Sequence, residues 1–82
     1  MKQDTALFNI DNVDKELAKK TIDDVYKALS ERGYNPTAQI VGYLISGDPG
    51  YISSYKEARL KIRSLDRAKI VEVLLEEFRK NK

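Results

Sequence analysis

The pattern of hydrophobic and polar positions changes near residue 14. Before it, residues 1–13 hold one apolar group, Leu7, Phe8 and Ile10, with no helical period. After it, apolar residues recur at steps of three and four, the spacing of one face of an α-helix. The sequence predicts a mobile N-terminal arm over 1–13 and a single helical domain over 14–82.

The first helix of this domain is predicted from Asp14 to Arg32, with Asn12 or Asp14 as its cap. Gly33 follows, and glycine suits the left-handed conformation just after a helix. Its apolar face is expected to contain Leu17, Thr21, Ile22, Val25, Tyr26, Ala28 and Leu29.

Two cap-and-proline pairs mark the middle of the chain. Asn35-Pro36 predicts a second helix whose residues are nearly all apolar, so we expect it to be the buried central element, ended by Gly47. Asp48-Pro49 repeats the device and predicts a short turn. Neither pair needs a ligand to explain it, although a glycine-bearing loop with Asp48 is also a candidate phosphate or metal site.

Two further helices are predicted in the last third. Residues 54–57 fit the capping box Ser-x-x-Glu, so a third helix is expected from about Ser54. The apolar phase then slips near Leu65, which predicts a break and a fourth helix capped by Asp66. With no period-two segment, the fold class is all-α, a compact bundle of about four main helices.

Composition narrows the function. The 82 residues contain no Cys, His or Trp, which removes thiol chemistry, the commonest general base and the commonest metal ligands. The adjacent Asp23 and Asp24 point about 100° apart on a helix, so we interpret them as a solvated face. We therefore predict no catalytic site, no metal and no cofactor, and a binding or regulatory module. Association of two copies is one way to enlarge its small core, although length alone does not show it.

Charge is unevenly placed although its sum is only +2. Within the basic stretch 54–69, Arg59, Arg63 and Arg67 are spaced by four, so on a continuous helix they would lie along one face. Such a face can bind an acidic protein, a phosphorylated residue or nucleic acid. A row of arginines is also typical of a helix surface that contacts only solvent. A helix-turn-helix dimer that binds nucleic acid through these arginines is the alternative interpretation. No apolar run is long enough to span a membrane, so a cytoplasmic location is expected.

Thr5 lies in the arm beside the apolar group. A threonine on a mobile segment suits a kinase, which needs an extended substrate, and phosphorylation adds about −1.5 to −2 charge. Thr5 is thus the candidate phosphoacceptor.

Several segments together resemble the IreB/ReoM family of small regulatory proteins from Gram-positive bacteria. They are Thr5-Ala-Leu-Phe-Asn9, Val25-Tyr-Lys-Ala-Leu29, Gly33-Tyr-Asn-Pro36, Gln39-Ile-Val-Gly-Tyr-Leu44, Ser46-Gly-Asp-Pro49 with Tyr51-Ile52, Ala58-Arg59 and Ile62-Arg63.

The resemblance implies a helical homodimer that is not an enzyme and has no small-molecule substrate. It implies phosphorylation at Thr5 by a membrane-anchored serine/threonine kinase, reversal by a phosphatase, and control of peptidoglycan synthesis and β-lactam tolerance. Partners implied are the Clp protease system and the first committed peptidoglycan-synthesis enzyme. The regulatory surface falls on Arg59, Arg63 and Arg67.

This chain departs from the family pattern at two places. Relatives have proline and arginine after the Tyr-Ile pair, where this chain has Ser53 and Ser54, so one basic position is missing. A second acceptor threonine of some relatives is also missing, because residues 1–4 contain none. Control by phosphorylation is therefore expected to rest on Thr5.

Overall fold

The computed structural model describes the backbone of residues 4–81 and the side chains of residues 14–81. These residues form four α-helices and two 3₁₀ turns, without a strand. In chain order they are α1 (Asp4–Glu31), α2 (Pro36–Ser46), η1 (Pro49–Tyr51), η2 (Tyr55–Glu57), α3 (Ala58–Arg63) and α4 (Arg67–Lys80). The predicted all-α fold with four main helices is confirmed.

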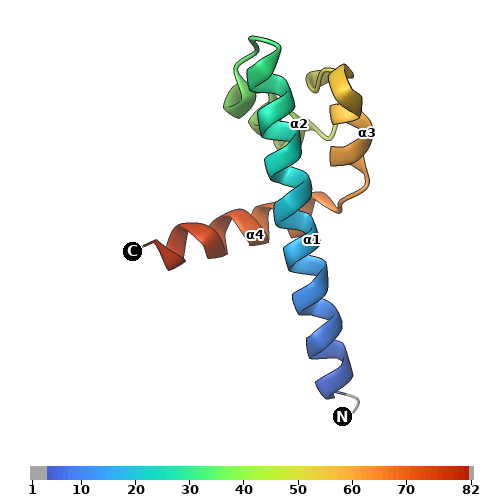
Figure 1. The fold of residues 1–82 in the computed structure, drawn as a ribbon, viewed down its shortest axis with the longest axis vertical. Helices are drawn as coiled ribbons and strands as arrows, with labels where there is room; N and C mark the ends of the chain where they lie inside the picture. The colour runs from blue at the N-terminus through green and yellow to red at the C-terminus, as the bar shows by residue number, and fades with distance from the viewer. Residues whose placement is uncertain (1–3, 82) are drawn as a thin grey trace.

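The long helix α1 is the centre of the fold. The other three helices all contact it, and in Figure 1 they gather around its second half. Val25 and Leu29 are fully buried, as the apolar stripe predicts. The assignment of Leu17 to that stripe is wrong: its side chain is 58% exposed, and Ala18, seven residues before Val25, is buried in its place.

The predicted start of this helix at Asp14 is also wrong, because α1 begins at Asp4. Once a helix is nucleated, each added residue gains a hydrogen bond at little cost, and residues 4–13 contain no glycine or proline to stop it. The mobility of residues 1–13 stays a prediction, since their side chains lie outside the described part.

Helix α2 has the predicted ends. The Asn35 side chain accepts a hydrogen bond from the Ala38 N–H, and Gly47 follows the helix with φ of 78°. The expectation that α2 is the buried centre is wrong. Only Ile40 and Tyr43 are buried, and Ile45 is 80% exposed, because α2 packs one face on α1 and η1 and leaves the other open.

The third helix begins four residues later than predicted, at Ala58. The Ser54 side chain makes no capping bond, and Lys56 and Glu57 have φ values of 50° and 62°, in the left-handed region. Left-handed backbone is unfavourable for these residue types and needs support from the surrounding structure.

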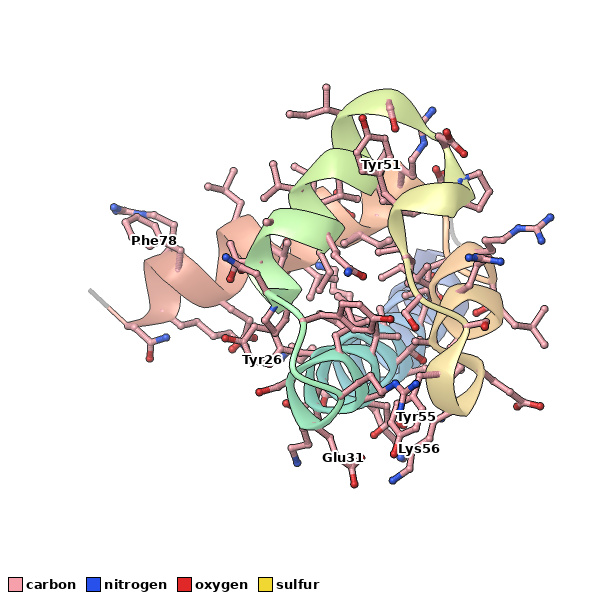
Figure 2. All side chains as sticks on the ribbon, turned by 90° about the horizontal axis from the view of Figure 1, so that it is seen from above. Tyr26, Glu31, Tyr51, Tyr55, Lys56 and Phe78 are labelled. Atoms are coloured by element: carbon pink, nitrogen blue, oxygen red, sulfur yellow. The ribbon has the colours of Figure 1, made fainter. Side chains whose placement is uncertain are left out.

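Contacts with the end of α1 supply that support. Lys56 Nζ lies 2.8 Å from a Glu31 carboxylate oxygen, and the Arg32 guanidinium lies 5.4 Å from the centre of the Tyr55 ring, within cation–π range. Figure 2 shows Glu31, Tyr55 and Lys56 together at this end of α1. These tertiary contacts replace the expected first helical turn with η2.

Helix α4 starts as predicted, with the Asp66 carboxylate accepting a hydrogen bond from the Ala68 N–H. It buries Ile70 and Val73 and crosses α1 in Figure 1, with its last half extending away from the other helices. Three ion pairs fix this crossing: Lys15–Glu76, Lys19–Glu77 and Lys69–Asp14, with N–O distances of 3.1, 2.7 and 3.9 Å.

Gly42, inside α2, faces the ring of Tyr51 from η1. A Cβ atom added at Gly42 would lie 2.5 Å from Tyr51 Cδ1. We predict that Gly42→Ala lowers the free energy of unfolding by about 1–3 kcal/mol, measured by denaturant titration, because the ring must shift.

The matched control is the same substitution in a Tyr51→Ala background. There Gly42→Ala should be neutral or stabilising by up to about 1 kcal/mol, since alanine favours helix more than glycine does. Equal destabilisation in both backgrounds contradicts the contact.

Candidate functional site

The structure divides the three predicted arginines between two helices. Arg59 and Arg63 belong to α3, and Arg67 is the first residue of α4, after the break at residues 64–66. The predicted break near Leu65 is confirmed, so the three arginines do not share one continuous helix face, and each has its own surroundings.

Two of the arginines hydrogen-bond to backbone carbonyls of one segment. Arg59 Nε donates to the Ile52 oxygen at 2.8 Å, and Arg67 Nη1 donates to the Leu44 oxygen at 3.1 Å. Leu44 lies in the last turn of α2, where backbone carbonyls have no partner within the helix. Sequence spacing gives no sign of these bonds, because Arg59 and Ile52 are 7 positions apart and Arg67 and Leu44 are 23 positions apart, in different structural elements.

Arg63 differs from its neighbours. It is exposed, and no hydrogen bond or ion pair of its side chain is found within residues 14–81. Its guanidinium, with five N–H donors and a fixed positive charge, is open to a carboxylate or phosphate.

The helix-turn-helix alternative gains no support from this arrangement. That motif joins its two helices by a turn of 3–4 residues. Here residues 47–57, containing η1 and η2, separate α2 from α3, and α3 is only 6 residues long.

The other candidate sites have structural explanations. Asp48 accepts a hydrogen bond from the Gly50 N–H at 2.9 Å and caps η1, as the cap-and-proline reading predicts. Asp23 pairs with Lys27 and Asp24 with Lys20 on the surface of α1. The described residues contain no group of three or more acidic side chains that could hold a metal ion.

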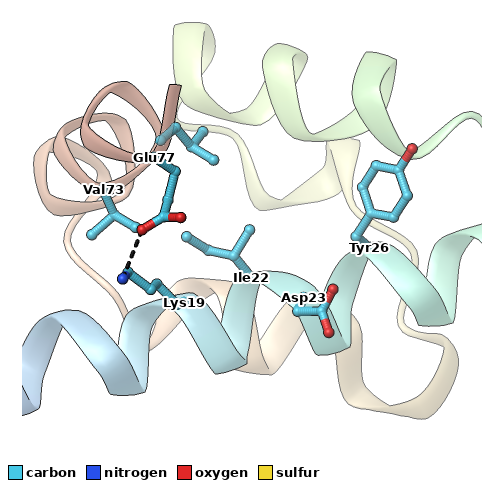
Figure 3. A pocket seen from close by; sticks show the side chains of 7 residues that line it. Lys19, Ile22, Asp23, Tyr26, Val73 and Glu77 are labelled. Atoms are coloured by element: carbon cyan, nitrogen blue, oxygen red, sulfur yellow. Dashed lines mark ion pairs between the residues drawn. The ribbon is translucent and has the colours of Figure 1, made fainter. Parts of the chain in front are cut away.

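An apolar groove lies where α1, α2 and α4 meet. It consists of two adjoining cavities of about 250 and 190 Å³ that share Ile22, Tyr26 and Leu74. Figure 3 shows Ile22 and Tyr26 on α1, facing the groove with Val73 of α4. Sequence reasoning missed this groove. It could have been found from Tyr26 and Leu74, because each widens the apolar stripe of its helix beyond the residues that pack into the core.

An ion pair borders the groove. Lys19 Nζ lies 2.7 Å from a Glu77 carboxylate oxygen, drawn as the dashed line in Figure 3. The hydrogen bond from Lys19 lowers the pKa of Glu77 below its ordinary value of 4.5, and the hydrogen bond to Glu77 raises the pKa of Lys19. Both groups remain charged at neutral pH and hold α4 against α1.

Thr5 is the second residue of α1, and its side chain lies outside the described part. The structure thus places its backbone in the first helical turn, and the pairing of Thr5 with the arginines stays a prediction.

An apolar groove between helices and an exposed arginine are surface features that can take part in binding another molecule. The family model for the IreB regulatory phosphoproteins matches residues 3–80, nearly the whole chain. The chain belongs to the IreB family. Within the described residues, no helix combines the length and apolar character needed to cross a membrane.

The Lys19–Glu77 pair predicts a pH dependence. Because the pKa of Glu77 is lowered in the folded protein, its stabilising contribution is present above pH 4.5 and is lost as the pH falls through the lowered pKa. NMR titration of the Glu77 carboxyl carbon should give a midpoint below 4.5. Lys19→Gln should move that midpoint back up, whereas the control Lys27→Gln, which breaks a pair elsewhere on α1, should not.

An unchanged Glu77 midpoint in Lys19→Gln contradicts the pair. A midpoint that rises equally in the Lys27→Gln control indicates instead a general effect of net charge.

Proposed function

We propose that this protein is a non-enzymatic regulatory phosphoprotein of the cytoplasm that acts by binding other proteins. It is the substrate of a membrane-anchored serine/threonine kinase and its phosphatase. It controls peptidoglycan synthesis and β-lactam tolerance, with the Clp protease system and a peptidoglycan-synthesis enzyme as candidate partners. The observation that carries this proposal is the match to a family of regulatory phosphoproteins over residues 3–80.

Thr5 is the proposed phosphoacceptor, and it lies within the matched range. A phosphate of about −2 charge takes the net charge of the chain from +2 to about zero. A change of that size alters the electrostatic interaction with a charged partner. Because the chain contains no histidine or cysteine, a kinase-added phosphate provides a regulatory group that its own side chains lack.

The phosphate is proposed to dock against the arginines and mask a surface that the unmodified protein offers. Lys69, two residues after Arg67, contacts Asp14, and Thr5 precedes Asp14 by nine positions. In a continuous helix this separation is about 14 Å along the axis. Docking onto Arg67 of the same chain therefore requires the first turns of α1 to unwind.

A homodimer is proposed to cover the apolar groove. Its rim carries Tyr26, Val41 and Leu74, each 40–50% exposed, and Leu75 and Phe78 continue the apolar surface along α4. In addition, the radius of gyration is 13.9 Å, against about 12 Å for a compact domain of this length. An open shape with exposed apolar side chains is typical of half of an interface.

Thr5→Ala should abolish labelling by the kinase. The control Thr37→Ala removes an exposed threonine at the start of α2 and should be phosphorylated to the same extent as the wild-type protein. Labelling is measured by intact mass and by peptide mapping.

Labelling that persists in Thr5→Ala, for instance at Ser53 or Ser54, contradicts Thr5 as the sole acceptor. In the labelled protein, docking requires NMR shift changes at the arginine side chains and loss of helical shifts in the first turns of α1. Unchanged shifts at both places contradict docking within the chain.

Leu74→Glu should convert the dimer to a monomer in sedimentation equilibrium, because a carboxylate buried in an apolar interface is strongly unfavourable. We expect the dissociation constant of the dimer to rise at least tenfold. The control Leu60→Glu changes an exposed leucine of α3, and it should leave the dimer intact. Monomers from both variants, or from neither, contradict the groove as the interface.

A further inference from the structure

The segment from Leu44 to Ile52 is held at both of its ends by arginine side chains from later in the chain. Arg67 bonds the Leu44 carbonyl, and Arg59 bonds the Ile52 carbonyl. The Arg59 backbone N–H also donates to the Ser53 oxygen at 3.0 Å. Within this segment lie the end of α2, the Gly47 turn and η1.

Gly47 and Arg67 fit closely together. A Cβ atom at Gly47 would lie 2.9 Å from Arg67 Cζ and Nη2, so the guanidinium rests against the glycine backbone. Glycine is needed at position 47 for two reasons. Its φ of 78° is unfavourable for other residues, and a side chain there would clash with the Arg67 guanidinium. The negative end of the α2 dipole lies at this position, which favours the cation.

Arg63, in contrast, makes no side-chain hydrogen bond to a backbone carbonyl of the described residues. It lies on α3 between the other two arginines in sequence, it is exposed, and within residues 14–81 its guanidinium has no partner. Of the three arginines, it is the one whose donors and charge are wholly available to another molecule.

We propose that the three arginines have two different roles. Arg59 and Arg67 are positioning residues that hold the 44–52 segment in place, and Arg63 contacts the carboxylates of an acidic partner protein directly. This division rests on the proposed function, in which these arginines form the partner-binding surface, and it assigns a separate role to each.

The first measurement is backbone hydrogen exchange of Gly47, Tyr51 and Ile52, whose amide groups donate to the backbone oxygens of Tyr43, Asp48 and Pro49. Arg67→Ala and Arg59→Ala should each raise these exchange rates about tenfold, the effect of losing a hydrogen bond to a charged donor. Arg63→Ala should leave them unchanged. Gly47→Ala keeps all three arginines and should raise the rates as Arg67→Ala does, which keeps the test valid if an arginine variant fails to fold.

The second measurement is binding of a fluorescent decaglutamate peptide, followed by anisotropy at low and high salt. Arg63→Ala should weaken binding about fivefold at low salt, with a smaller loss at high salt because the contact is exposed. The matched control is Arg79→Ala, which removes an exposed arginine from the last turn of α4 and should have little effect.

The proposal is overturned if Arg67→Ala leaves the exchange rates unchanged, or if Arg63→Ala raises them. It is also overturned if Arg63→Ala and Arg79→Ala weaken peptide binding equally, or if the unchanged protein does not bind the peptide. Kinase labelling at Thr5 is independent of all these outcomes, so a failure here is distinguishable from a failure of the proposed phosphorylation.

Discussion

The burial of one face of α1 is the constraint on which the rest of the structure depends. Val25 and Leu29 are fully buried there, and the fully buried Ile52, Ile62 and Ile70 come from segments that pack around them. A chain of 82 residues without a disulfide has room for only one such core. Polar groups that could meet a partner must therefore lie outside this core, on the exposed helix faces and in the turns between the helices.

Charged side chains help to hold the connections between the helices, in addition to apolar residues such as Ile52 and Leu65. Arg59 and Arg67 hold the 44–52 segment by carbonyl oxygens, and Lys56 holds η2 through Glu31. Each exposed pair contributes little alone, about 0–1 kcal/mol, but together they fix the register of short elements. Much of the positive charge of residues 54–69 is thus used inside the fold, and less of it remains for a partner than a count of charges suggests.

Local signals predicted both ends of α2 and the start of α4, and tertiary contacts account for the error at the start of α3. Asn35, Gly47 and Asp66 act within a few residues of themselves, so their roles follow from the sequence. The capping box at Ser54 is overridden because Tyr55 and its neighbours bind the end of α1, which no local pattern reveals. The candidate site was predicted as a set of arginines, but the bonds that separate their roles cross between elements distant in the sequence.

The two surfaces left by the core lie on different sides of α1. In Figure 2, Tyr26 of the groove and Phe78 of α4 lie on one side, while α3 lies on the other. A second copy seated on the groove would therefore leave α3, with Arg63, open to solvent. Dimerisation and partner binding would then not compete for the same residues. Under the proposed function, phosphorylation of Thr5 would then act on the arginine side through the charge that it adds.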